Sequence, residues 1–227
     1  MHNDIINNNY DESQIQVLEG LEAVRKRPGM YVGSTSLRGL HHLIYEIVDN
    51  SIDEALAGAC STITVKLHKD GSASVADDGR GIPAAIHHKM GIPTPEVVFT
   101  VLHAGGKFGG TGYKISGGLH GVGASVVNAL SEWFEYKNCF EHKCYTQRFE
   151  RGKVVRNFNC EGTCEDNGLT VRFMPDKTIF EETEFDYSVI LNRMREQAFL
   201  NAGVAISVID ERGEDTIENH LHNEGGV

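Results

Sequence analysis

Four stretches of the chain between residues 132 and 174 have the pattern of β-strands, and no helical pattern separates them. Helical patterns occur before and after this region, but they do not alternate regularly with strands. A doubly wound parallel sheet needs that alternation and is therefore disfavoured. We expect an α+β fold, a two-layer α/β sandwich in which helices pack on one face of a mixed, mostly antiparallel sheet. The expected strands cover residues 62–68, a segment ending at 76, 132–139, 143–150, 153–159, 168–174 and 204–209.

The chain is expected to consist of an arm, one domain and a tail. Residues 1–12 are polar and rich in Asn, which is typical of a mobile arm. Residues 13–210 carry the strand and helix patterns and are long enough for one domain with a sizeable core. Residues 211–227 are charged and lack a core pattern, so we expect a tail that leads to a further domain. The expected helices cover residues 13–27, 40–57, 95–102, 122–130 and 187–202.

Charge and composition exclude several classes of protein. The formal net charge is −11, whereas a segment that held a nucleic-acid backbone by itself would carry a basic face. No run of about 18 apolar residues is present and the first residues do not form a signal peptide, so we expect a cytoplasmic protein without membrane contact. The five cysteines are an odd number, and the Cys139/Cys144 and Cys160/Cys164 spacings differ from those of zinc knuckles. We therefore expect free thiols.

The expected helix at residues 40–57 carries a stripe of polar side chains on an otherwise apolar segment. Glu46, Asn50, Asp53 and Glu54 follow one another at i, i+4, i+7 and i+8, so they share one helix face. Burying carboxylates without partners is costly, so the stripe is expected to line a cavity rather than the core. A carboxylate there can orient a water molecule, and an amide oxygen one turn later can bind Mg²⁺. The alternative is an ordinary solvated helix face.

The loop from Asp77 to Gly81 directly follows an expected strand. A carboxylate at a strand end can accept a hydrogen bond from an exocyclic amine, and the adjacent glycines let a ligand approach the backbone. An ordinary Asp-Gly turn is the alternative interpretation.

Residues 103–123 are rich in glycine and lead into an expected helix. Backbone N–H groups at a helix N-terminus, together with the helix dipole, favour a bound phosphate. The glycine spacing matches neither a P-loop nor a dinucleotide-binding fingerprint. A disordered linker is the alternative, but it would not be followed at once by a helix, and it need not alternate its glycines with Lys107, Tyr113 and His120.

The order of these elements resembles the Bergerat-fold ATPases, and in detail the B subunits of bacterial type II DNA topoisomerases. The resemblance covers about residues 10–210 and concerns the N-terminal ATP-binding subdomain of that family. The segments that carry it are residues 20–31, 46–54, 77–83, 102–108 and 116–130.

The resemblance implies separate roles for the residues around the nucleotide. Glu46 would be the general base that polarises the attacking water, supported by His42, and Asn50 would bind Mg²⁺. Asp77 would accept the adenine amine, and Glu54 would pair with Arg80. Residues 103–123 would form a glycine-rich lid over the nucleotide. Further residues are implied in nucleotide binding: Glu54, Arg80, Gly81, Ile82 and Pro83 at the adenine side, Tyr113 on the lid, and Gly105, Gly106, Lys107, Leu119, His120, Gly121, Val122 and Gly123 around the triphosphate.

Two positions depart from the pattern of the family. Phe140 stands where an arginine is common at the pocket edge. Leu169 stands where a threonine is common after the glycine of a late strand. Thr170 would take that place if the strand were shifted by one residue, and it is included in the expected nucleotide site on that basis.

The implied function is ATP-dependent negative supercoiling of DNA, with ATP and Mg²⁺ as cofactors. Two copies would dimerise on binding ATP, with Tyr10 and Ile15 on the arm reaching the partner copy. The A subunit and DNA would contact the full-length protein rather than this segment, and competitive inhibitors would bind the ATP site. Because the family's second subdomain supplies a lysine to the γ-phosphate, the segment is expected to bind ATP with little turnover.

Three alternatives remain open at this stage. The decatenating paralogue shares all the motifs. A chaperone or histidine kinase uses a related fold, although the segments at residues 25–31 and 117–123 argue against both. A binding module without hydrolysis is the third, and the presence of both Glu46 and Asn50 argues against it.

Overall fold

A computed structural model describes residues 20–102 and 123–225. Its strands form one eight-stranded sheet in the order β5-β4-β3-β6-β2-β1-β7-β8. Strands β1 and β7 pair in parallel, and the six other pairs are antiparallel. The expected mixed, mostly antiparallel sheet is therefore confirmed. The strands are β1 (Thr62–Leu67), β2 (Ala73–Asp77), β3 (Ser131–Phe140), β4 (Lys143–Glu150), β5 (Lys153–Thr163), β6 (Gly168–Pro175), β7 (Ala205–Asp210) and β8 (Ile217–His222).

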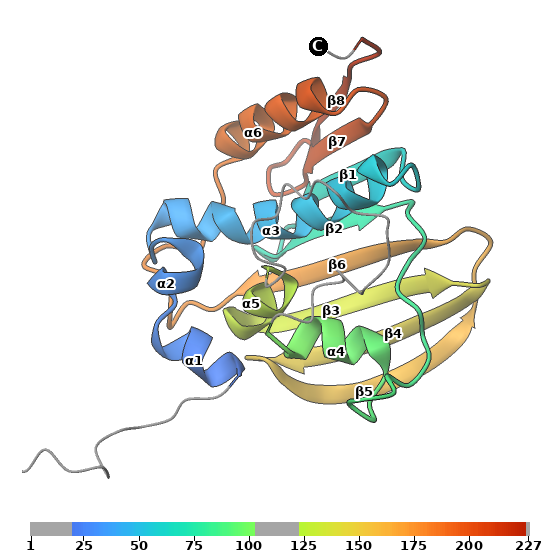
Figure 1. Ribbon diagram of the computed structural model, residues 1–227. Coiled ribbons are helices and arrows are strands. Elements are labelled where there is room, and N and C mark those ends of the chain that lie inside the picture. Colours follow the sequence, from blue (N-terminus) through green and yellow to red (C-terminus); the bar gives the residue numbers. More distant parts are fainter. Residues whose placement is uncertain (1–19, 103–122, 226–227) are drawn as a thin grey trace, which may run out of the picture.

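The helices form a second layer on one face of the sheet (Figure 1). The long helix α3 crosses over β1 and β2 and contacts α5, while α5 also lies against β3 and β4. This arrangement confirms the α+β sandwich. The helices are α1 (Leu21–Lys26), α2 (Gly29–Val32), α3 (Leu37–Leu56), α4 (Thr94–Thr100), α5 (Gly123–Ala129) and α6 (Tyr187–Leu200).

The core lies between the two layers and follows the periodicities of the sequence. In α3, Leu43, Ile44 and Val48 are fully buried, and each such side chain contributes about 1.5–3 kcal/mol by leaving water. Alternate residues of the strands complete the core from the other side. Phe99 of α4 continues it by packing on an aromatic group of the sheet, which is formed by Phe134, Tyr136 and Phe149.

Two features near the N-terminus differ from the expected pattern. The short helix α2 is not among the expected helices, and α3 begins at Leu37 rather than at residue 40. Gly33, at φ 82°, ends α2, and Ser36 in an extended conformation precedes α3. A four-residue helix has too few residues to show a periodicity, which explains why the sequence does not reveal it.

The region expected to be a charged tail, from residue 211 on, contains a strand that the sequence analysis does not predict. Strand β8 pairs with β7 over six residue pairs and extends the sheet to its edge. Its residues are mostly exposed and polar, because an edge strand is held by backbone hydrogen bonds rather than by a buried face. Such a strand has no hydrophobic alternation for sequence analysis to detect.

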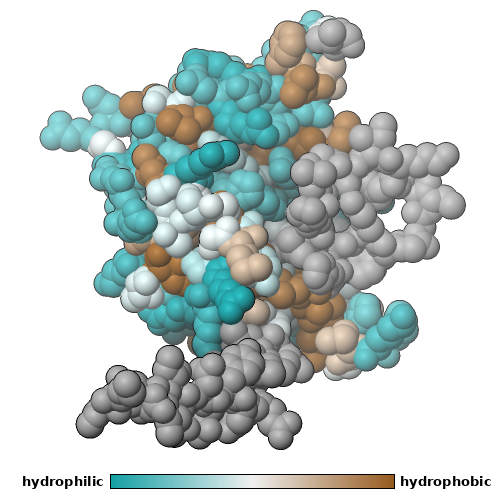
Figure 2. Space-filling model, turned by 60° about the vertical axis from the view of Figure 1, so that its left-hand side comes forward, coloured by the Kyte–Doolittle hydropathy of each residue, from teal (hydrophilic) through white to brown (hydrophobic). Residues whose placement is uncertain are grey.

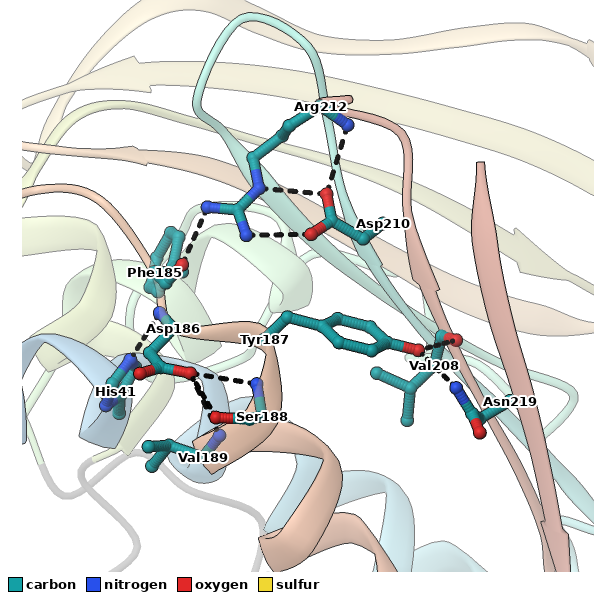
Figure 3. Close-up of polar contacts among 10 residues, drawn as sticks. All are labelled: His41, Phe185, Asp186, Tyr187, Ser188, Val189, Val208, Asp210, Arg212 and Asn219. Atoms are coloured by element: carbon teal, nitrogen blue, oxygen red, sulfur yellow. Dashed lines mark hydrogen bonds and ion pairs between the residues drawn. The ribbon is translucent and has the colours of Figure 1, made fainter. Parts of the chain in front are cut away.

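Side chains of the C-terminal region tie α6 to β7 and β8 (Figure 3). The hydroxyl of Tyr187 donates to the carbonyl oxygen of Val208 at 3.1 Å and accepts from Asn219 Nδ2 at 2.8 Å. Arg212 holds Asp210 through two side-chain hydrogen bonds and also donates to the carbonyl oxygen of Phe185. These contacts explain why the segment after β7 folds back onto the domain.

His41 connects the start of α3 to the same region and gives the fold a defined response to pH. Its ring is buried, and Nε2 accepts a hydrogen bond from the backbone N–H of Asp186 at 2.9 Å. Burial lowers the pKa of His41, against the opposing charges of Asp186 and Glu182. The folded protein therefore holds His41 neutral, while the unfolded chain takes up a proton near pH 6.5.

We expect this group to destabilise the domain as pH falls below about 6.5, until the pH reaches the folded-state pKa. Replacing His41 by glutamine keeps an acceptor but removes the titration. The fall in melting temperature between about pH 7.5 and about pH 5.5 should thus be smaller in His41→Gln than in the wild type, by a few degrees. Thermal unfolding at both pH values measures this. The exposed His220→Gln is the control and should keep the wild-type fall; an equal fall in His41→Gln would contradict the assignment.

No helix in the described part of the chain combines the length and apolar character needed to cross a membrane. On the face drawn in Figure 2, hydrophobic residues appear in separate groups among hydrophilic ones. All five cysteines are free thiols, as expected.

Candidate functional site

Glu46 and His42 form a pair on the same face of α3. His42 Nε2 lies 2.8 Å from Glu46 Oε1, and both side chains are partly exposed. The hydrogen bond to Glu46 is the largest cause of the raised pKa of His42, with burial opposing it. The pair therefore places a carboxylate where water can reach it and fixes its orientation from one turn earlier on the helix.

The N-terminus of α5 lies against this carboxylate. A Cβ atom added to Gly123 would clash with Glu46 Oε2, so a side chain at position 123 would displace the carboxylate. Gly123 is the described member of the expected phosphate-binding set. The others, Gly105, Gly106, Lys107, Leu119, His120, Gly121 and Val122, lie outside the described residues, as do Tyr113 and the arm residues Tyr10 and Ile15.

Asp77 ends strand β2 beneath α3 and is held from two sides. Ser51 Oγ donates to Asp77 Oδ2 at 2.7 Å, and the backbone N–H of Gly79 donates to Oδ1 at 3.0 Å. Burial raises the pKa of Asp77, and these hydrogen bonds oppose the rise. Ser51 is not among the expected site residues. A small polar residue at a buried position of α3 is the signal in the sequence that could have revealed it.

The polar stripe of α3 is not uniform. Glu46, Asp53 and Glu54 are partly buried, whereas Asn50 is exposed. Among the described residues, the Asn50 carboxamide has no side-chain hydrogen-bond partner. The stripe therefore combines partly buried carboxylates with an exposed amide one turn after Glu46.

Glu54 anchors the loop that follows Asp77. Its carboxylate accepts from Arg80 Nη2 at 2.8 Å and from Arg80 Nε at 3.0 Å. The expected pairing of these residues is therefore present in the structure. Because the Arg80 side chain is 58 % exposed, this ion pair contributes little to stability and mainly orients the loop.

Asn138 on β3 holds the other end of the same loop, and sequence reasoning missed it. Its Oδ1 accepts from the N–H of Ile82 at 2.8 Å, and its Nδ2 donates to the carbonyl oxygen of Ile82 at 2.7 Å. Gly81 lies close to β3 at φ 74°, where a Cβ atom would come 2.5 Å from the carbonyl oxygen of Cys139. Pro83, next in the loop, is exposed.

The strand register decides between Leu169 and Thr170. Leu169 pairs with Asp77 on β2 and with Asn138 on β3, so these three side chains share the face under the helices. Thr170 pairs with Ala76 and Lys137, and its side chain points to the opposite face. Including Thr170 in the site is therefore wrong, and the strand shift that would have placed it there does not occur. Phe140, the other position that departs from the family pattern, is partly buried at the end of β3.

Asp49 is a third residue, after Ser51 and Asn138, that the sequence does not single out. It lies on α3 between Glu46 and Asp53, and Gln197 Nε2 approaches its Oδ1 at 3.5 Å. Burial first, and then the charge of Glu46, raise the pKa of Asp49 to about 6. Asp49 therefore takes up a proton near pH 6, where an ordinary aspartate is still ionised.

The fold and the arrangement of these side chains define a class of protein. The chain belongs to the family of histidine kinase-, DNA gyrase B- and HSP90-like ATPases, whose model matches residues 35–179. That range contains the polar stripe of α3, Asp77 and its loop, and Gly123.

The chain is also similar to particular members of that class. It is 61% identical over 219 residues to the B subunit of DNA gyrase from Clostridium acetobutylicum, a match that covers 96% of this chain and 34% of the relative. It is 59% identical to the gyrase B subunit of Halalkalibacterium halodurans, with the same coverage. The B subunit of DNA topoisomerase 4 from Enterococcus faecalis is 58% identical over 224 residues, which are 98% of this chain and 33% of that relative. The chain thus spans about a third of the length of these relatives.

Proposed function

We propose that this chain is the ATP-binding and ATP-hydrolysing domain of a bacterial DNA gyrase B subunit, a cytoplasmic enzyme that drives negative supercoiling. The observation that carries the proposal is the arrangement on α3: Glu46 is oriented by His42, lies against Gly123 and precedes the exposed Asn50 by one turn. Identities of 61% and 59% to gyrase B subunits support it.

In this proposal Glu46 accepts a proton from the attacking water, and the His42 ring keeps the carboxylate in position. The contact with Gly123 places Glu46 beside the start of α5, where a helix N-terminus favours phosphate. The α3–α5 contact would thus bring the base and a bound phosphate together. The expected contribution of such a base is about 10²–10⁴-fold in rate.

Mg²⁺ is proposed as the cofactor of the nucleotide, with Asn50 as its protein ligand. The exposed carboxamide of Asn50 suits a hard cation. The described part of the chain offers no cluster of three or more His, Cys, Asp or Glu side chains suited to a metal. The other ligands would therefore be phosphate oxygens and water, as is usual for Mg²⁺ bound with a nucleotide.

Asp77 is proposed to accept the hydrogen bond of the adenine amine. Ser51 and Gly79 each use one oxygen of the carboxylate, and carboxylate oxygens have further lone pairs for the amine. The loop residues Arg80, Gly81, Ile82 and Pro83 would border the base. Competitive inhibitors of ATP are proposed to use the same carboxylate.

In the complete enzyme, ATP is proposed to dimerise two copies through the arm, with Tyr10 and Ile15 as contacts. The A subunit and DNA are proposed to meet other parts of the full-length protein. The acidic net charge of this chain, −11, supports the absence of a DNA contact here. Decatenation, as the B subunit of topoisomerase IV, is the second candidate, which the 58% identity to the Enterococcus faecalis relative favours.

Calorimetry and phosphate release test the proposed function. We expect one molecule of a non-hydrolysable ATP analogue to bind per chain, and chelation of Mg²⁺ to weaken binding. We also expect little phosphate release from ATP at low protein concentration, because hydrolysis awaits dimerisation. A protein that binds no nucleotide, or a dilute monomer that turns over ATP rapidly and steadily, would refute the proposal.

A further inference from the structure

The loop after β2 spans three strands of the sheet. Asp77, Leu169 and Asn138 are successive partners across β2, β6 and β3, on the face that lies under the helices. The loop leaves β2 at Asp77 and reaches β3 at Ile82. Residues 78–82 therefore pass from one end of this row of side chains to the other.

The two ends of the loop are held by different kinds of contact. At the β2 end, Asp77 accepts from the N–H of Gly79, and Glu54 binds the exposed Arg80. At the β3 end, the Asn138 carboxamide makes both of its hydrogen bonds to the backbone of Ile82. The Asn138 side chain thus pairs with the backbone of Ile82 through one donor and one acceptor, as a neighbouring strand would.

The β3 end is also the buried end. Asn138 is 0% exposed, so its carboxamide is shielded from water, and the loss of either hydrogen bond would leave a polar atom of Asn138 buried without a partner. The close approach of Gly81 to the carbonyl oxygen of Cys139 shows that the backbone itself docks on β3 at this point. Asn138 consequently holds the β3 end of the loop in place.

We propose that Asn138 is a positioning residue of the nucleotide site: its carboxamide fixes Ile82 relative to Asp77 and so sets the surface presented to the purine. The proposal rests on the proposed function, because it assumes that the base binds beside Asp77. Asn138 acts through Ile82 and has no part in the step at Glu46. Its effect should therefore fall on affinity for the nucleotide and not on the activation of water.

The first test replaces Asn138 by leucine, which keeps the volume and removes both hydrogen bonds. We expect Asn138→Leu to weaken binding of a non-hydrolysable ATP analogue by about 10-fold, because the Ile82 backbone loses both partners and the loop moves. Calorimetry measures the affinity. In a full-length subunit that carries this domain, KM for ATP should rise while kcat stays nearly unchanged.

Gln147 supplies a matched control on the neighbouring strand. It is also fully buried, and its carboxamide also makes two side-chain hydrogen bonds, to Tyr136 and Glu96. Gln147→Leu should lower the melting temperature as Asn138→Leu does but leave nucleotide affinity within about twofold of the wild type. If both variants lost the same nucleotide affinity, lower stability alone would explain the effect of Asn138→Leu. That result would overturn the proposal.

Asn138→Asp provides a second test, in which nucleotide affinity is expected to recover with pH. A general loss of stability would not produce this recovery. A protonated carboxyl group has the donor and acceptor of the carboxamide, whereas the ionised group turns an acceptor toward the Ile82 carbonyl oxygen. We expect the affinity of Asn138→Asp, relative to the wild type at the same pH, to recover as pH falls. A ratio that does not change with pH would contradict the proposal. Failure of the wild type to bind nucleotide would instead reject the proposed function, so the two failures are distinguishable.

Discussion

Replacement of Glu46 by glutamine should lower the rate of ATP hydrolysis by about 100-fold or more in a full-length subunit that carries this domain. Glutamine keeps the size and the hydrogen-bonding reach of the side chain but cannot accept a proton from water. The 2.8 Å contact between Glu46 and His42 shows that the carboxylate is already oriented. Phosphate release at saturating ATP measures the effect.

Affinity for a non-hydrolysable ATP analogue should change by less than about threefold in the same variant, because Glu46 is proposed to act on the attacking water and not to hold the nucleotide. Glu196→Gln on α6 is the matched control, since Glu196 is exposed and pairs only with Arg193 among the interactions described. The control should hydrolyse ATP at the wild-type rate. Full hydrolysis by Glu46→Gln would remove Glu46 from the mechanism, and a large loss of affinity would give it a binding role instead.

The largest loss of affinity is expected for Asp77→Asn. The amide replaces one acceptor oxygen by a donor, which would face either the Ser51 hydroxyl, the Gly79 N–H or the adenine amine. A charged hydrogen bond to the amine is also lost, so we expect nucleotide binding to weaken by about 10–100-fold. The same calorimetric titration should show a much smaller loss for Glu46→Ala, which acts on water.

Asp78→Asn is the control for this substitution, because it makes the same chemical change one residue away. Asp78 accepts from the backbone N–H groups of Ser61 and Thr62 at 2.8 and 2.9 Å. Burial acts to raise the pKa of Asp78, but its hydrogen bonds to Ser61 and Thr62 together hold that pKa well below the usual range. The control should lower stability and leave affinity nearly intact. If Asp78→Asn weakened binding as much as Asp77→Asn, or Glu46→Ala weakened it more, the adenine role of Asp77 would be wrong.

Periodicity predicts the parts of the site that lie on one element. The 3.6-residue repeat is enough to place Glu46, Asn50 and Glu54 together on α3, and the turn chemistry after β2 is enough to mark Asp77. Contacts between distant segments are not predictable in this way. Ser51 and Asp77 are 26 positions apart, and Asn138 and Ile82 are 56 apart, so only the sheet order brings them together.

Strand register explains the error at β6. A shift of one residue moves every side chain of a strand to the other face, and the sequence of residues 168–170 does not fix the choice between Leu169 and Thr170. The pairing with β2 does. Strand β8 is missed for a different reason: its residues are mostly exposed and polar, so residues 217–222 show no pattern that predicts a strand.

The two outermost strands of the sheet have a consequence for how copies of this chain behave at high concentration. An open sheet edge can recruit a strand from another molecule and start aggregation. Strand β5 departs from regular pairing with β4 at three places and carries Lys153 and Arg156 around the exposed Val154 and Val155. Strand β8 is polar, and the net charge of −11 makes copies repel one another. Both edges are therefore poor templates for fibre growth, and this favours a chain that remains dispersed.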